Sequence, residues 1–127
     1  MLKIKRVYDP PARGDGERIV VDRIWPRGLP KRAAAADKWM KDLGPSHTLR
    51  TWFGHDPGRW GEFRRRYVAE LHMERDALAT IARKAARGAV TLLFGARDRD
   101  HNQAVVLKAV IGRLPTKAPP RKRRCAA

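Results

Sequence analysis

Cysteine is almost absent from this 127-residue chain: Cys125, close to the C-terminus, is the only one. A single cysteine cannot form a disulfide within the chain, and it has no partner at the spacing of a metal-binding motif. Because proteins of oxidising compartments commonly use disulfides, this composition favours a reducing, cytoplasmic location.

Long apolar runs are also lacking. Segments such as "TLLF" (91–94) and "AVVL" (104–107) are far shorter than the roughly 20 residues that span a bilayer. The N-terminal "MLKIKRVYD" (1–9) alternates charged and apolar residues and has no apolar centre of the kind found in signal peptides. We therefore expect no membrane association.

The motifs that would name a reaction are missing as well. The sequence contains no Walker-type phosphate loop, no dinucleotide-binding glycine pattern, no zinc motif and no nucleophile elbow. Asp98 and His101 are three residues apart, but two candidate ligands do not make a metal site, so we predict none. The sequence names neither a cofactor nor an oligomeric state.

Acidic residues are scarce relative to basic ones. Asp and Glu number 13 against 29 Lys and Arg, which gives a net charge of +16 and an isoelectric point of about 11.3. Residues 113–127 contribute six positive charges and no negative one, which leaves +10 on residues 1–112. Such a charge attracts nucleic acid, phosphate-bearing small molecules or acidic surfaces. The alternative is that it serves solubility alone.

The chain does contain short apolar segments that alternate with helical patterns. The expected elements are strands at 2–9, 18–25 and 89–96, and helices at 31–44, 45–56, 56–88 and 97–114. A break is expected in the longest helical segment near 72–76. This order predicts an α/β fold. We expect a small single domain over residues 1–114, with a short, mostly parallel sheet of three or four strands flanked by helices. A basic, mobile tail is expected at 115–127.

The strands at 18–25 and 89–96 are apolar on both faces, which is typical of the inner strands of a parallel sheet. Because only helices are expected between them, we predict that they are parallel and adjacent. Ligands bind at the carboxyl ends of the strands in such sheets. Both strand ends are polar: one carries "DRIWPRG" (22–28) and the other "GARDRDHNQ" (95–103).

These strand ends and the nearby "WFGHD" (52–56) supply the candidate site. The candidates for binding an anionic, planar substrate are Asp22, Arg23, Trp25, Arg27, Trp52, Arg97 and Asn102. Arginine holds phosphate or carboxylate through two hydrogen bonds, and tryptophan stacks on flat rings. The candidates for catalytic proton transfer are His55, Asp98 and His101. Backbone amides at the start of the last helix would add an anion site.

Each candidate also has a structural interpretation. Arg23 either holds an anion or is itself held by Asp98, and Asp22 with Arg23 would then belong to an internal ion-pair network. Asp98 is otherwise a helix cap. The tryptophans are otherwise core residues, the histidines structural, and "RRR" (64–66) a solvated helix face.

Three stretches together resemble a known family: "VVDRIWPRGLPK" (20–31), "WMKDLGPSHTLRTWFGHDPGRWGEFRRRYVAEL" (39–71) and "VTLLFGARDRDHNQAVVLKAVI" (90–111). They are similar to the bacterial YeaO-like family of small proteins, domain of unknown function 488. The resemblance covers nearly all of the chain except the loop at 10–17 and the residues after about 114. It implies a compact α/β cytoplasmic domain and supplies no reaction, cofactor or substrate.

The residues that match the family's signature are Asp22, Arg23, Trp25, Arg27, Lys31, Trp52, His55, Asp56, Asp98, His101 and Asn102. The chain departs from the family pattern at two neighbouring positions. Phe94 stands where members usually have Tyr, and Gly95 where they have Ala or Ser. The first departure removes a hydroxyl from the strand end, which weakens any role for a phenol there.

Three function hypotheses follow. The first is a small enzyme acting on a nucleotide or a nucleic-acid-derived anion, because acids, histidines and arginines gather at the strand ends. The second is a nucleic-acid-binding or regulatory protein without catalysis, which the charge of +16 favours. Neither a helix-turn-helix pattern nor an aromatic RNA-binding motif supports it. The third is a structural or partner-binding domain.

Overall fold

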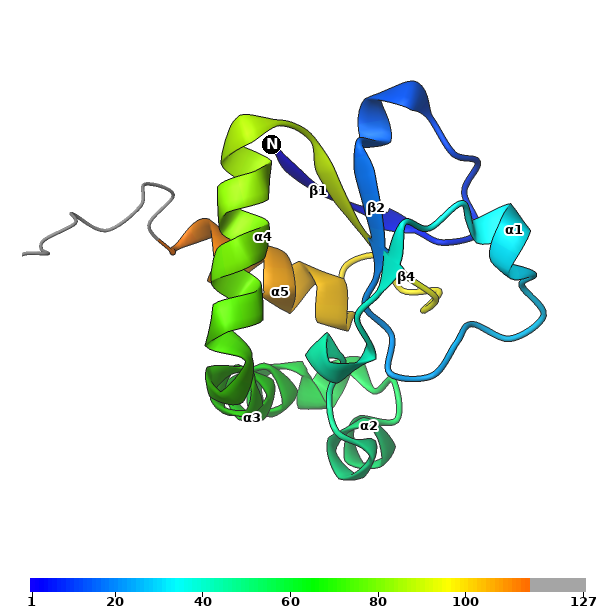
Figure 1. Cartoon of the computed structure of the whole chain (residues 1–127). Helices are drawn as coiled ribbons and strands as arrows, with labels where there is room; N and C mark the ends of the chain where they lie inside the picture. The colour runs from blue at the N-terminus through cyan, green and yellow to red at the C-terminus, as the bar shows by residue number, and fades with distance from the viewer. Residues whose placement is uncertain (115–127) are drawn as a thin grey trace, which may run out of the picture.

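The computed structural model describes residues 1–114 (Figure 1). Four parallel strands form one sheet in the order β1-β4-β2-β3. The strands are β1 (Leu2–Arg6), β2 (Glu17–Val20), β3 (Lys38–Trp39) and β4 (Val90–Phe94). The predicted α/β class is confirmed, as is the parallel pairing of β2 with β4. The tail predicted at 115–127 lies outside the described residues.

The helices surround this sheet and begin where the local sequence caps them. They are α1 (Lys31–Ala34), α2 (His47–Phe53), α3 (Trp60–Leu71), α4 (Arg75–Arg87) and α5 (Gln103–Gly112). The Ser46 hydroxyl accepts the backbone N–H of Leu49 at the start of α2. Asp56 caps the 3₁₀ turn η3 (Pro57–Arg59), which leads into α3. The predicted break between the two long helices is the 3₁₀ turn η4 (His72–Glu74).

Alternate residues of the strands face opposite sides of the sheet. Ile19 and Leu92 face the main core, which they share with side chains of α3, α4 and α5. Val20 and Leu93 face the other way and form a smaller core with Ala34 of α1. Figure 1 shows this division, with α4 and α5 on one side of the sheet and α1 on the other. Helices therefore cover both faces, but unequally.

The helix predicted at 31–44 is wrong. Only α1 is helical there, and the segment continues as the edge strand β3 and the 3₁₀ turn η2 (Lys41–Leu43). The prediction of a wholly helical connection from β2 to β4 is therefore also wrong. The connection contains the strand β3, which pairs with β2. The alanine-rich sequence favours a helix locally, so a contact from elsewhere in the chain must end it.

Arg18 on β2 supplies that contact. Its guanidinium donates hydrogen bonds to the carbonyls of Ala34, the last residue of α1, and of Ala35, the residue that caps it. Ala35 takes a left-handed conformation, with φ of 49°, and turns the chain back toward the sheet. The Asp37 carboxylate then accepts the backbone N–H of Arg18 at 2.8 Å. Interactions with β2 thus override the helix propensity of the alanine run.

Other boundaries also differ from the prediction, two of them by five residues or more. The strand expected at 18–25 ends at Val20, because the chain leaves the sheet after the Val21 N–H donates to the Leu93 carbonyl. The helix expected at 97–114 begins only at Gln103, where the Asn102 side chain caps it. The residues before it form a loop. The irregular segments that follow β2 and β4 are therefore longer than predicted.

Candidate functional site

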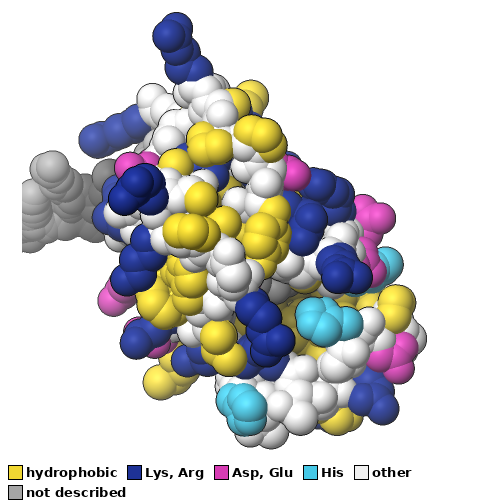
Figure 2. Space-filling view, turned by 90° about the vertical axis from the view of Figure 1, so that its right-hand side faces the viewer, with side chains coloured by type: hydrophobic (Ala, Val, Ile, Leu, Met, Phe, Trp, Pro, Cys, Tyr) yellow, Lys and Arg dark blue, Asp and Glu magenta, His cyan; other side chains and the backbone are white. Residues whose placement is uncertain are grey.

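A pocket of about 560 Å³ opens at the carboxyl ends of β2 and β4. The segment after β2, helix α2 and the loop between β4 and α5 contribute its lining. The sequence-predicted residues among them are Asp22, Arg23, Trp25, Arg27, His55, His101 and Asn102. Figure 2 shows Lys, Arg and His side chains close together beside a hollow on one face of the molecule. The predicted convergence of the two strand ends thus occurs in space.

Asp22 is the half-buried acid of this pocket. Its Oδ2 accepts the backbone N–H of Gly95 at 2.9 Å, and its Oδ1 accepts the side-chain amide of Gln103. Burial raises the pKa of Asp22 to about 6, although these hydrogen bonds and the charge of Arg50 act in the opposite direction. The carboxyl group can therefore gain or lose a proton close to neutral pH.

Asp98 and His101 form a hydrogen-bonded pair in the loop after β4. The His101 Nδ1 lies 2.9 Å from Asp98 Oδ2, while Asp98 Oδ1 accepts the backbone N–H groups of Asp100 and His101. These hydrogen bonds hold the pKa of Asp98 below its usual range. The His101 ring also packs edge-on against the ring of Trp60, with 5.1 Å between the ring centroids. Asp98 is absent from the pocket lining and positions His101, which is part of it.

Asn102 has a structural task. Its side-chain oxygen accepts the Val105 N–H at the start of α5, and its amide nitrogen donates to the Asp98 carbonyl at 2.9 Å. The side chain therefore caps the helix whose backbone amides were expected to bind an anion. Asn102 is buried, so a substitution there would disturb both the helix and the loop.

Arg23 is not held by Asp98, contrary to one of the two sequence-based alternatives. Its guanidinium donates to the carbonyls of Gly44 and Pro45 at 2.8 and 2.9 Å, and it lies 4.0 Å from the exposed Asp42 carboxylate. Asp98 is engaged with His101 instead. Arg23 thus ties the segment after β2 to the chain that precedes α2, and forms one wall of the pocket.

Two other arginines line the pocket with free guanidinium groups. Among residues 1–114, no hydrogen bond or ion pair engages the side chain of Arg27 or Arg50. Arg50 was missed from the sequence, as was Gln103. On α2 the lining residues His47, Arg50 and Thr51 recur at helical spacing, which is the signal that could have identified the arginine.

Of the remaining aromatic and histidine candidates, Trp25 and His55 line the pocket, whereas Trp52 does not. Trp25 lines the pocket, donates its indole N–H to the Leu29 carbonyl and packs against Trp39 at 5.3 Å. His55 is exposed at the rim and takes a left-handed backbone conformation, with φ of 58°. Trp52 lies outside the pocket lining. The Arg66 guanidinium lies over its ring, 4.4 Å from the ring centroid.

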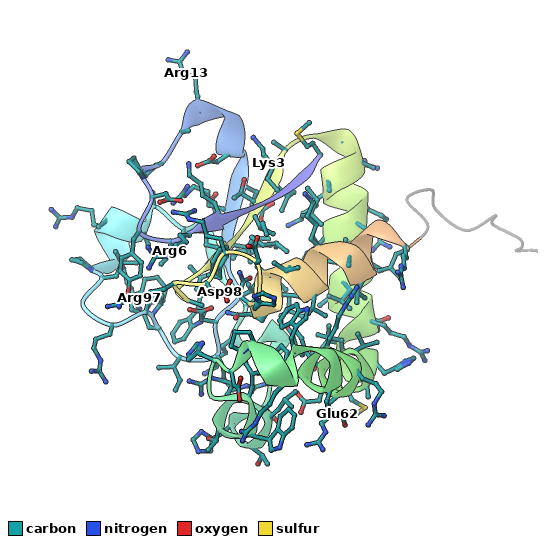
Figure 3. The ribbon with its side chains drawn as sticks, turned by 180° about the vertical axis from the view of Figure 1, so that it is seen from behind. Lys3, Arg6, Arg13, Glu62, Arg97 and Asp98 are labelled. Atoms are coloured by element: carbon teal, nitrogen blue, oxygen red, sulfur yellow. The ribbon has the colours of Figure 1, made fainter. Side chains whose placement is uncertain are left out.

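Arg97 also lies outside the pocket lining. It is exposed, and its side chain extends away from the loop that carries it, whereas Asp98 lies close to that loop (Figure 3). Arg6, at the end of β1, anchors this loop by donating a hydrogen bond to the Ala96 carbonyl at 2.9 Å. Arg6 and the Arg99–Asp9 ion pair therefore anchor this loop, and Arg97 does not.

Two properties of the described residues bear on cofactors and membranes. Among residues 1–114, no three His, Cys, Asp or Glu side chains come together in a way that could hold a metal ion. Within the same range, none of the helices has both the length and the apolar character needed to cross a membrane.

The fold and the pocket together define a small α/β protein with a ligand-sized pocket at the carboxyl ends of its strands, in which basic side chains outnumber the single acid, Asp22. The chain belongs to the family described as the inactive DUF488-N3 subclade, which matches residues 1–123. This confirms the resemblance to the YeaO-like proteins.

Individual relatives agree with that assignment. The chain is 43% identical to the uncharacterized protein YeaO of Escherichia coli (strain K12) over 109 residues, which are 84% of this chain and 92% of YeaO. It is 38% identical over 110 residues to the uncharacterized proteins Rv3073c of Mycobacterium tuberculosis and Mb3100c of Mycobacterium bovis. The aligned part is 87% of this chain and 92% of each relative. No solved structure matches the chain.

Proposed function

We propose that the chain binds a phosphate-bearing ligand with a flat ring, of the nucleotide class, in the pocket at the ends of β2 and β4. The observation that carries the proposal is the pair of arginines, Arg27 and Arg50, which line the pocket with guanidinium groups free of protein partners among residues 1–114. A free guanidinium holds a phosphate through two charge-assisted hydrogen bonds. Phe53 and Trp25 add aromatic surface for the ring.

Binding without turnover is the form of this function that we favour. The family description calls the subclade inactive. Arg23 and Asn102, which the sequence offered as substrate-binding groups, are engaged in hydrogen bonds that hold the pocket together. The pocket is therefore stable in shape without a ligand, as a binding site requires.

Catalysis is the second candidate, and one observation favours it. Burial raises the pKa of the Asp22 carboxyl to about 6, so it can exchange a proton near neutral pH, and His101, which Asp98 positions by a hydrogen bond, lines the same pocket. A small enzyme acting on a nucleotide would use them as acid and base. The experiment described below distinguishes binding from catalysis, because it also detects whether the ligand is chemically changed.

The nucleic-acid alternative draws on the charge of +16. A pocket of about 560 Å³ admits one nucleotide unit and not a duplex. If nucleic acid is the physiological partner, a single-stranded end bearing a phosphate would therefore enter the pocket while the basic surface contacts the rest. An oligonucleotide with a 5′-phosphate would then bind more tightly than the same oligonucleotide without it.

Calorimetric titration with ribose 5-phosphate and with nucleoside monophosphates tests the proposal. We expect binding by the wild type, and about tenfold weaker binding by Arg50→Gln, because one charge-assisted contact is lost. Arg64→Gln, which removes an exposed arginine from α3, is the matched control and should bind normally.

Chromatography of the ligand after incubation completes the experiment. Unchanged ligand supports binding alone, and released base or phosphate would favour the enzyme. Equal affinities of Arg50→Gln and Arg64→Gln would remove the proposed phosphate site.

A further inference from the structure

Asp22 is a half-buried carboxylate, and the charge of Arg50 acts on it without a hydrogen bond or an ion pair between the two side chains. Among the described residues, no Lys, Arg or His forms an ion pair with it, and its only hydrogen-bond donors are Gly95 N–H and the Gln103 amide. An ionised carboxylate has about four acceptor positions, so about two remain open. Because Asp22 also lines the pocket, a bound molecule can reach it. A charge removed from water is normally matched by donors, so a ligand that displaces water from the pocket would have to supply the donors for the open positions of Asp22.

The orientation of Gln103 follows from the same contact. A carboxylate only accepts hydrogen bonds, so the amide must present Nε2 to Asp22 Oδ1. Its carbonyl oxygen, Oε1, then has no partner among residues 1–114. Gln103 also lines the pocket. Asp22 and Gln103 together therefore offer carboxylate and carbonyl acceptors to a ligand, with the second N–H of the Gln103 amide as the one remaining donor of the pair.

The pocket thus presents two kinds of group with opposite requirements. The arginines Arg27 and Arg50 require an anion, whereas the edge formed by Asp22 and Gln103 requires N–H donors. Guanine is the base that carries two neighbouring donors on one edge, N1–H and the 2-amino group. Adenine has an acceptor, N1, beside its amino group, and this would face the carboxylate. Hypoxanthine keeps N1–H and lacks the 2-amino group.

We infer that Asp22 and Gln103 read the Watson–Crick edge of guanine, and that the ligand of the pocket is a guanine nucleotide. The inference rests on the proposed function for the phosphate end of the ligand. It adds the identity of the base and assigns Asp22 to specificity rather than to chemistry. A site built around buried polar groups rejects a ligand that leaves them without partners, so discrimination should be strong.

Calorimetry with GMP, IMP, AMP, guanosine and ribose 5-phosphate tests this inference. We expect GMP to bind the wild type about tenfold more tightly than IMP and about 100-fold more tightly than AMP, since one and then two contacts are lost. Guanosine and ribose 5-phosphate should each bind more weakly than GMP, because each keeps only one end of the ligand.

The variant Asp22→Asn provides the second arm. In it, the new amide can still accept the Gly95 N–H, and Gln103 can turn over to accept the asparagine N–H, so the fold should persist. The edge then offers donors in place of acceptors. We expect GMP binding to fall to the level of ribose 5-phosphate, with ribose 5-phosphate binding unchanged. Asp100→Asn, which changes an exposed acid of the loop between β4 and α5, is the matched control and should keep the preference for GMP.

The possible outcomes distinguish a failure of the proposed function from a failure of the guanine inference. If ribose 5-phosphate binds and depends on Arg50, but GMP, IMP and AMP bind equally, the guanine inference is overturned and the proposed function stands. If guanosine binds as tightly as GMP and Asp22→Asn abolishes this, the phosphate proposal fails and the base assignment stands. Binding of none of the five compounds overturns both.

Discussion

The backbone N–H of Gly95 meets the Asp22 carboxylate at 2.9 Å, and a Cβ on residue 95 would lie only 2.8 Å from that same oxygen. The contact joins the segments that follow β2 and β4, which are 73 residues apart in sequence. With the Asp22 side chain placed as it is in this chain, a Cβ on residue 95 would therefore require the carboxylate to shift. The pocket depends on this contact, because it places the acid against the loop before α5.

Gly95→Ala should accordingly destabilise the protein. The added methyl group must displace the Asp22 carboxylate, which leaves the residue-95 N–H without its acceptor. We expect a loss of about 1–2 kcal/mol in the free energy of unfolding, measured in urea at pH 7.5. The matched control is Gly61→Ala in α3, where a Cβ meets nothing within 4 Å. Alanine should be neutral or stabilising there. Equal effects of the two substitutions would contradict the packing described for Asp22.

The pKa of Asp22 gives a second prediction, with a definite sign. Burial raises this pKa from an ordinary 3.8 to about 6, so between these values the folded chain binds more protons than the unfolded chain. The contribution of Asp22 to stability is therefore most favourable below about pH 4 and is lost as the pH rises through about 6. The full loss is about 3 kcal/mol, from two pH units at 1.36 kcal/mol each.

Comparison of the wild type with Asp22→Asn isolates this contribution, since the other titrating groups are common to both. The unfolding free energy of the variant, relative to the wild type, should rise by about 2–3 kcal/mol between pH 4 and pH 7.5. Urea titrations at intervals across that range measure it. A difference that stays constant with pH would mean that the Asp22 carboxyl has an ordinary pKa.

Arg18 and Asp15 form a buried ion pair away from the pocket, with 4% and 5% of their surfaces exposed. Burial raises the pKa of Asp15, but hydrogen bonds from Ala12 N–H, Lys5 and Arg18 outweigh it and lower the pKa to about 2. Arg18→Met should remove the cap of α1 and leave the acid without its closest cation. We expect a cost of about 3–5 kcal/mol in urea unfolding. Arg13→Met, an exposed change in the same loop, should cost less than about 0.5 kcal/mol.

The core strands were predictable because their signal is local. Residues 90–94 are apolar on both faces, and a strand buried on both sides needs that pattern. The segment at 31–44 was not predictable in the same way. Its alanines favour a helix, and the interaction that ends it comes from Arg18, which is more than a dozen residues away.

The site was predictable to the extent that topology determines it. Parallel strands bring their carboxyl ends to one edge, so Asp22 and His101 could be expected to share a pocket. Arg97 and Trp52 were also expected there, but neither lines the pocket, because the direction of a side chain on an irregular loop or a short helix depends on packing. Arg50 enters from the pocket-facing side of α2, which becomes visible only once the helix is placed.

The last prediction concerns Arg23, whose bidentate contact to the carbonyls of Gly44 and Pro45 identifies it as a structural arginine. Lysine keeps the charge but cannot reach two carbonyls with a planar fork. Arg23→Lys should therefore lower the free energy of unfolding by about 1–2 kcal/mol without any ligand present. Arg50→Gln should leave stability nearly unchanged, because its guanidinium has no protein partner among residues 1–114, and should weaken the binding of ribose 5-phosphate. Urea unfolding and calorimetry of both variants, side by side, measure this contrast. A stable Arg23→Lys that fails to bind phosphate would reverse the two assignments and make Arg23 the anion-binding residue.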